Sequence, residues 1–198
     1  MQNMNEELIN QIRKDMKQSL PARRYNHTLG VAYTAASMAM CHGYDVQKAF
    51  AAGLLHDSAK YYSDEKLIAE CEKHNLPMSE IERRNPYLLH GKAGAIIAYE
   101  QYNIVEEDIL NAIRFHTTGR PGMSLLEKIL FVADYIEPGR KRIDGLTKVR
   151  TLAFHNLDGC VVKILQDTID YLSSTKDKEI DATTLETYTF YTTCGKEK

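Results

Sequence analysis

The chain has 198 residues, of which 43% are hydrophobic and 26% are charged, and its formal net charge is −2. This composition is typical of a globular protein, and the length suits one domain that buries its own core. A near-neutral charge argues against a protein that binds nucleic acid through a large basic surface. A membrane helix is also excluded, since no segment approaches the ~20 consecutive apolar residues that it needs.

The N-terminal segment and the cysteines indicate a cytoplasmic protein. Residues 1–20 are amphipathic and mixed in charge, without the apolar stretch and cleavage site of a signal peptide. The four cysteines, which are Cys41, Cys71, Cys160 and Cys194, form no C-x-x-C pair. We therefore expect free thiols in a reducing compartment, not a disulfide framework or a thiolate zinc site.

Apolar residues recur at helical spacing along almost the whole chain, which predicts an all-α, single-domain bundle over residues 1–198. The predicted helices cover residues 4–20, 21–42, 45–57, 63–75, 87–102, 105–115, 124–136 and 157–173. Gly43 is expected to end the second helix, and Asp45 and Asp181 are expected to cap later ones. Capping boxes are predicted in two places, Ser79 with Glu82 and Ser124 with Glu127.

Two segments near the end of the predicted bundle are less regular. Residues 137–145 read as a loop, because Pro138, Gly139 and Gly145 punctuate a strongly basic stretch. The sequence TYTFYTT, close to the C-terminus, has real strand propensity. A helix end or an oligomer contact that serves a homodimer is the alternative for this segment.

The seven histidines fall into two groups. Three lie where predicted helices stop, and a histidine there can bond free carbonyls and interact favourably with the helix dipole; these are His42, His74 and His155. The other four lie among apolar or small residues of separate helices, namely His27, His56, His90 and His116. A single buried histidine is usually a satisfied core residue, but several in such contexts are difficult to explain in that way.

Two aspartates add to this second group of histidines. Asp134 lies inside the apolar stretch KILFVADYIEP, where a carboxylate is at least partly buried and needs a cation or a metal as partner. Asp57 directly follows His56 at the end of an apolar helix. Imidazole and carboxylate groups without thiolates suit Fe, Mn, Zn or Ni better than a purely structural zinc site.

The order H…HD…H…H…D along a helical chain resembles the HD-domain superfamily of metal-dependent phosphohydrolases. A closer resemblance, to the YqeK family of bacterial HD proteins, is carried by the segments RYNHTLGV, AAGLLHDSAK, LLHGKAGA, FHTTG and KILFVADYIEPGR. These segments lie in order between residues 24 and 140, and residues 145–198 add C-terminal helices. The resemblance implies a symmetrical diadenosine tetraphosphate hydrolase, which cleaves a dinucleoside polyphosphate into two molecules of ADP.

The resemblance also implies a centre of two metal ions, with iron favoured and Mn, Co, Zn or Mg as alternatives. One ion would be held by His27, His56, Asp57 and Asp134. Asp57 would bridge to the second ion, which His90 and His116 would hold. Two ions can activate water, hold the substrate and stabilise the negative charge that develops on phosphate oxygens. We expect the catalytic residues to be His56, Asp57, Lys60 and Arg140.

Basic side chains near the metal ligands are candidates for phosphate contacts, and they are Arg24, Lys60, Lys92 and Arg140. Lys60 would lie on the same face as Asp57 if the helix continued for one more turn. An exposed, solvated lysine is an equally good interpretation. The forked guanidinium of Arg140 suits phosphate oxygens.

The residues around the second ion are further candidates for substrate contacts. His90 and His116 would lie against the phosphates. The backbone and hydroxyl donors that follow His116, which are Thr117, Thr118 and Gly119, can bind phosphate or merely form a turn.

Three other functions fit parts of the same pattern. An HD enzyme can act on another nucleotide, such as a dNTP or a nucleoside diphosphate, and an HD core can bind nucleotides without turnover. A helical bundle without metal is the third alternative. The complete ligand set favours an enzyme, because a binding module does not need an open centre of two metal ions.

Overall fold

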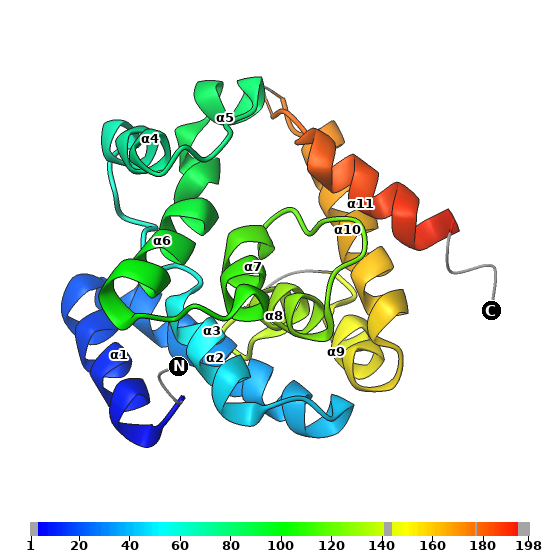
Figure 1. Ribbon diagram of the computed structural model, residues 1–198. Helices are drawn as coiled ribbons and strands as arrows, with labels where there is room; N and C mark the ends of the chain where they lie inside the picture. Colours follow the sequence, from blue (N-terminus) through cyan, green and yellow to red (C-terminus); the bar gives the residue numbers. More distant parts are fainter. Residues whose placement is uncertain (1–3, 141–143, 177, 194–198) are drawn as a thin grey trace.

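The structure is a computed structural model that describes residues 4–140, 144–176 and 178–193. Helices are its only regular secondary structure within these ranges, which confirms the predicted all-α fold (Figure 1). No helix among the described residues is long and apolar enough to cross a membrane. The helices are α1 (Glu6–Ser19), α2 (Ala22–His42), α3 (Val46–Leu55), α4 (Asp64–Lys73), α5 (Glu80–Arg84), the 3₁₀ helix η1 (Pro86–Leu89), α6 (His90–Tyr102), α7 (Glu107–Phe115), α8 (Leu125–Ile136), α9 (Leu146–His155), α10 (Leu157–Ser174) and α11 (Ala182–Thr193).

The helix ends follow the capping signals of the sequence. Gly43 has φ of 74°, the left-handed conformation that ends α2 without strain. Both predicted capping boxes are present, because Ser79 and Ser124 each accept from the backbone N–H three residues later. The carboxylates of Glu82 and Glu127 in turn accept from the backbone N–H groups of Ser79 and Ser124. These pairs satisfy N–H groups that a helix start leaves free.

Two predicted helices differ from the observed ones near the site. The helix predicted over residues 87–102 is divided, since η1 occupies its first turn and α6 begins only at His90. Helix α3 ends at Leu55, and consecutive turns follow it. Lys60 is therefore placed by a turn, in which its backbone N–H donates to Asp57 O at 3.0 Å, and not by a further helical turn.

The C-terminal segment TYTFYTT is helical, so the strand reading is wrong and the helix alternative holds. Tyr188 of α11 donates to Gln166 of α10, and Tyr191 packs against the core. This tertiary packing overrides the strand propensity of the segment. Asp181 begins α11 as predicted, because its carboxylate accepts from Thr183 N at 2.8 Å. The homodimer contact remains a prediction.

The histidines predicted at helix ends lie there. His42 is the last residue of α2, and its Nε2 donates to a backbone carbonyl of α9 at 2.8 Å. His74 follows α4, and His155 ends α9. Helix α9 lies within residues 145–198, where C-terminal helices were predicted, and it ends at the position that His155 indicated. Cys41, Cys71 and Cys160 are free, and Cys194 lies outside the described residues.

Four central helices, α2, α3, α7 and α8, pack closely around the apolar core. Helices α2 and α3 touch backbone to backbone, since a Cβ atom on Gly53 would come within 2.5 Å of Ala32 Cα. Helices α4, α5 and α6 form one arm above this base, and α10 and α11 form the other (Figure 1). The arms meet at their tips, where Arg84 pairs with Glu179 at 2.7 Å.

Candidate metal centre

Helix α6 and the four central helices bring the other five predicted ligand residues together around Asp57. His27 lies within α2, and Asp134 lies within α8. The other histidines stand at helix ends: His56 follows α3, His90 begins α6 and His116 follows α7. A helix end can direct a side chain along the axis, so these elements converge on one point. Asp57, His56, His90 and His116 are all buried.

The three histidines at helix ends are oriented by the same backbone contact. In each of them Nδ1 donates to the carbonyl three residues earlier, at 2.7 Å in His56, 2.6 Å in His90 and 2.7 Å in His116. Because a carbonyl oxygen only accepts, Nδ1 carries the proton and Nε2 keeps its lone pair. Such contacts fix the tautomer of histidines that bind metal through the other nitrogen.

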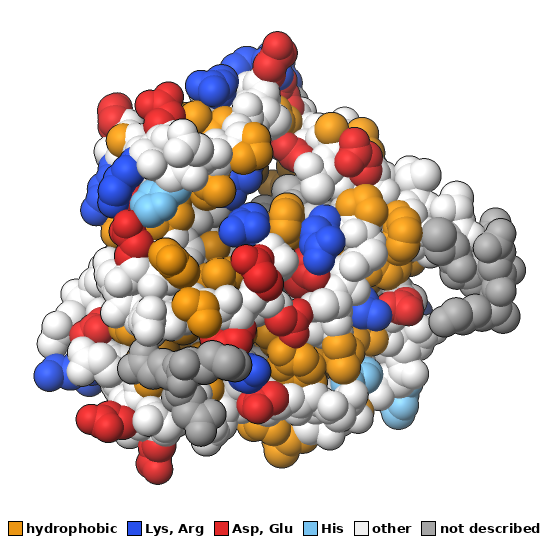
Figure 2. Space-filling model, viewed as in Figure 1, with side chains coloured by type: hydrophobic (Ala, Val, Ile, Leu, Met, Phe, Trp, Pro, Cys, Tyr) orange, Lys and Arg blue, Asp and Glu red, His pale blue; other side chains and the backbone are white. Residues whose placement is uncertain are grey.

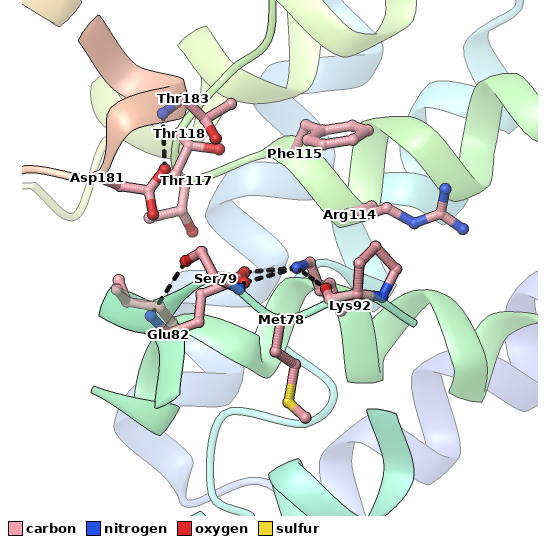
Figure 3. A pocket seen from close by; sticks show the side chains of 12 residues that line it. Met78, Ser79, Glu82, Lys92, Arg114, Phe115, Thr117, Thr118, Asp181 and Thr183 are labelled. Carbon is pink, nitrogen blue, oxygen red and sulfur yellow. Dashed lines mark hydrogen bonds and ion pairs between the residues drawn. The ribbon is translucent and has the colours of Figure 1, made fainter. Parts of the chain in front are cut away.

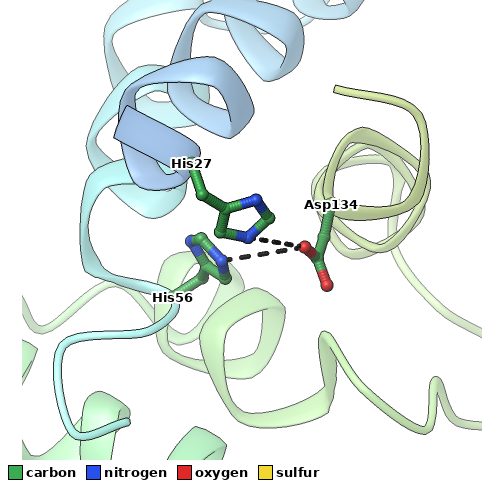
Figure 4. Close-up of side chains that lie close together, drawn as sticks. All are labelled: His27, His56 and Asp134. Atoms are coloured by element: carbon green, nitrogen blue, oxygen red, sulfur yellow. Dashed lines mark ion pairs between the residues drawn. The ribbon is translucent and has the colours of Figure 1, made fainter. Parts of the chain in front are cut away.

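The first group of ligands faces one oxygen of Asp57. Asp57 Oδ2 lies 3.3 Å from His56 Nε2 and 3.8 Å from His27 Nε2. Asp134 Oδ1 lies 3.0 Å from His27 Nε2 and 3.9 Å from His56 Nε2 (Figure 4). His27, His56 and Asp134 thus turn their donor atoms toward one point, as the ligands of a single ion do.

The second group faces the other oxygen of the same carboxylate. Asp57 Oδ1 lies 3.4 Å from His90 Nε2 and 3.8 Å from His116 Nε2. The two imidazole nitrogens are 3.1 Å apart. Asp57 therefore stands between the two groups with one oxygen directed to each.

Buried nitrogen atoms without hydrogen-bond partners, and donor atoms that lie close together, show that these residues fit metal ions. The Nε2 atoms of His27 and His56 are buried without a well-formed hydrogen bond, which is costly unless another partner takes their lone pairs. Within this cluster, two sets offer three donor atoms within 4.8 Å of one another, namely His27 with His56 and Asp134, and His56 with Asp57 and His116. The donors are imidazole and carboxylate throughout, which suits transition metals.

The pKa shifts in the cluster favour neutral His90 and His116 and an ionised Asp57. Burial would lower the pKa of His56, but the charge of Asp57 outweighs burial and raises this pKa. Burial lowers the pKa of His90 to about 3, and it lowers the pKa of His116 to about 4. Burial alone would raise the pKa of Asp57, but the charges of His56, His116 and Lys60 outweigh it and hold this pKa well below the usual range. Neutral imidazole and ionised carboxylate are the forms that bind metal.

Three of the predicted cations lie at the edge of the cluster. Arg24 donates to Asp57 Oδ2 at 2.7 Å, and Arg140 donates to Asp134 Oδ1 at 2.8 Å. Lys60 Nζ lies 3.0 Å from His90 Nε2. The fourth, Lys92, is directed elsewhere and pairs with Glu82 at 2.7 Å.

The donors predicted after His116 divide into two kinds. Thr117 Oγ1 lies 3.2 Å from His116 Nε2, next to the second group of ligands. Thr118 instead donates to Gly119 O at 2.9 Å, and the backbone N–H of Gly119 donates to Phe115 O at 2.8 Å. For Thr118 and Gly119 the second of the two predicted alternatives therefore holds, since their hydrogen bonds form a turn.

Glu137 is a site residue that the sequence reading missed. Its carboxylate is buried and lies 3.1 Å from His27 Nδ1, in the position that backbone carbonyls occupy for the other histidines. Two glycines make room for it, because a Cβ atom would come within 2.6 Å of Glu137 Oε2 at Gly30 and within 2.8 Å at Gly139. The sequence contained one signal of this contact: Gly30, which lies one turn after His27 in the middle of a helix and leaves space for another side chain.

We expect Glu137→Ala to weaken metal binding by roughly 10–100-fold, the usual cost of removing a partner that orients a histidine ligand. Titration of the metal-free protein with Mn²⁺ or Fe²⁺ measures this affinity directly. Glu137→Gln keeps an oxygen that can accept from His27 and should recover part of the loss. Glu186→Ala, which removes an exposed carboxylate from α11, should leave the affinity unchanged. Equal affinity in Glu137→Ala and the wild type would contradict this role.

A cavity of about 1130 Å³ opens on the first group of ligands. Its lining includes His27, Arg24, Arg140, Glu137 and Tyr61. The volume suffices for a nucleotide, since small-molecule sites usually measure ~300–1,000 Å³. Its lining carries three arginines and one carboxylate, so it is positive on balance, which suits phosphate groups; these residues are Arg23, Arg24, Arg140 and Glu137.

A helical domain that gathers histidines and aspartates around an adjacent His–Asp pair defines the class of metal-binding HD domains. The HD domain family matches residues 24–139, and the chain belongs to this family, as the resemblance predicted. It is 44% identical over 173 residues to the "Bis(5'-nucleosyl)-tetraphosphatase, symmetrical" of Halalkalibacterium halodurans, covering 87% of this chain and 91% of that protein. The Bacillus subtilis protein of the same name is 39% identical, with the same coverage.

A solved structure agrees with the fold along nearly the whole chain. It is the crystal structure described as a "predicted HD superfamily hydrolase involved in NAD metabolism" from Clostridium acetobutylicum. It superposes with a TM-score of 0.89 at 40% sequence identity, and the match covers 92% of this chain and 96% of that one.

Proposed function

We propose that this protein is a metal-dependent hydrolase that cleaves diadenosine tetraphosphate symmetrically into two molecules of ADP. The observation that carries the proposal is Asp57, whose two oxygens face two separate groups of histidines. Relatives that match most of the chain bear the name of the symmetrical tetraphosphatase. Water adds to one of the two central phosphorus atoms, the bond to the oxygen between them breaks, and ADP leaves from each side.

The residues fit a pair of metal ions that share Asp57. His27, His56 and Asp134 would hold one ion with Asp57, and His90 and His116 would hold the other. Iron is the favoured metal because of the family resemblance. Such a pair would lower the pKa of a water molecule and withdraw charge from phosphate oxygens.

The cations of the chain would hold the phosphates beside this centre. Arg24, Lys60 and Arg140 lie within 4 Å of Asp57 or Asp134, so they border the place where a reacting phosphate arrives. Guanidinium groups bind phosphate oxygens through two parallel hydrogen bonds. Lys60 adds a compact charge on the side of His90.

A substrate panel with identified products tests this function. We expect the metal-loaded protein to release only ADP from diadenosine tetraphosphate, with a kcat/KM at least tenfold above that for any dNTP or nucleoside diphosphate. Faster turnover of an ordinary dNTP would assign another nucleotide substrate to the same site. Metal-loaded protein that cleaves no phosphoanhydride would support a binding module.

A further inference from the structure

A second cavity, of about 360 Å³, lies on the His90 and His116 side of the metal centre. We propose that it binds one nucleoside of the substrate, while the larger cavity on the His27 side binds the other. This inference rests on the proposed function, because only a substrate with a nucleoside at both ends needs two such sites.

The small cavity adjoins the second group of ligands through Thr117, although neither His90 nor His116 lines it. Leu88 and Lys92, which lie on either side of His90 in the chain, line it. Phe115 and Thr117, the two neighbours of His116, line it as well. Thr117 also lies 3.2 Å from His116 Nε2, so a single residue borders both the metal centre and the cavity.

The positions of the two cavities match the symmetry of the substrate. In diadenosine tetraphosphate two phosphates separate the central anhydride from each nucleoside, so two arms of equal length leave the reacting bond. The large cavity is bordered by His27, which faces Asp57 Oδ2. The small cavity is bordered by Thr117, which lies 3.2 Å from His116 Nε2, and His116 faces Asp57 Oδ1. One arm can therefore leave the centre on each side of Asp57.

The chemistry of the small cavity suits a neutral nucleoside better than phosphate. Lys92 is neutralised by Glu82 at 2.7 Å and also donates to a backbone carbonyl at 2.7 Å. The side chain of Arg114 extends away from the other lining residues (Figure 3). Met78 and Phe115 supply apolar and aromatic surface, on which a purine ring can pack.

The outer wall of the cavity joins the two arms of the fold. Figure 2 shows the surface hollowed between these arms. Ser79 and Glu82 line the cavity from the α5 side, and Asp181 and Thr183 line it from the start of α11. Arg84 and Glu179 tie these walls together with hydrogen bonds of 2.7 and 3.3 Å. The Asp181 carboxylate and the Ser79 hydroxyl are suitable partners for ribose and base.

A filling substitution tests the second nucleoside site. Thr183→Phe places an aromatic ring in the small cavity from the first turn of α11, and Ala182→Phe is a matched control because Ala182 is exposed and lies outside the lining. The substrates are diadenosine tetraphosphate and adenosine 5′-tetraphosphate, which has a single nucleoside. We expect kcat/KM for diadenosine tetraphosphate, divided by kcat/KM for adenosine 5′-tetraphosphate, to fall about tenfold in Thr183→Phe. This is the size of the effect of losing one base-packing contact. Ala182→Phe should keep the wild-type ratio.

Binding of ADP to the metal-loaded protein provides a second measurement. Calorimetry should find two ADP molecules per chain in the wild type and in Ala182→Phe, but one in Thr183→Phe. An equal loss for both substrates in Thr183→Phe, or a wild type that cleaves both substrates equally well, would overturn the inference. A wild type that releases no ADP from either substrate would instead refute the proposed function, so the two failures are distinguishable.

Discussion

Asp57→Ala is expected to lower the turnover of diadenosine tetraphosphate by roughly 10³-fold or more, because the two oxygens of Asp57 face both groups of histidines. Without its carboxylate, His56 and His90 lose the negative charge between them. Arg24 loses its partner as well, but its side chain is 28% exposed and water can solvate it. We therefore expect the variant to fold while it fails to hold its metal ions.

Three measurements separate these effects in Asp57→Ala: ADP release, metal content and helical content by circular dichroism. Asp57→Asn keeps the shape of the side chain and should also lose activity, which excludes a cavity as the cause. Asp170→Ala removes an exposed aspartate from α10 and serves as the control. If Asp57→Ala kept both metal ions and more than a tenth of the activity, the shared carboxylate would not be essential.

The sequence predicted the helical fold because its local signals agree with the tertiary structure. Gly43 ends a helix, and Ser79 and Ser124 begin helices, through contacts within a few residues. The C-terminal helix was ambiguous for the opposite reason. The strand propensity of its threonines and tyrosines is local, whereas Tyr188 is held by Gln166 on another helix. No pattern within one segment reveals such a contact.

The convergence of the site residues could be anticipated only in part. An ionisable group in an apolar stretch needs a partner, so the apolar neighbours of Asp134 were enough to predict it as a site residue. Glu137 did not, since its contact with His27 joins residues 110 positions apart. Lys60 and Lys92 were both candidate phosphate contacts, yet a turn places Lys60 beside His90, whereas Glu82 holds Lys92 away from the cluster. Sequence spacing does not encode these choices.

Gly53→Ala is expected to destabilise the fold and the metal centre together. The added Cβ atom would come within 2.5 Å of Ala32 Cα and 2.9 Å of Ala32 N, so it meets backbone atoms that cannot rotate away. Helices α2 and α3 must separate, and such overpacking costs about 3 kcal/mol, which exceeds the gain of about 1 kcal/mol from replacing a helical glycine by alanine. Because α2 carries His27 and α3 ends beside His56, the separation also moves these ligands apart.

Urea unfolding of the metal-free protein measures the cost of Gly53→Ala in free energy, and Mn²⁺ titration measures the effect on the centre. Gly43→Asn is the matched control, since a Cβ atom at Gly43 meets no atom within 4 Å and asparagine tolerates the left-handed conformation there. We expect the free energy of unfolding of this control to lie within about 1 kcal/mol of the wild-type value. A Gly53→Ala variant as stable as the wild type would mean that α2 and α3 have room to adjust, and the close contact of these helices would then not determine the distance between His27 and His56.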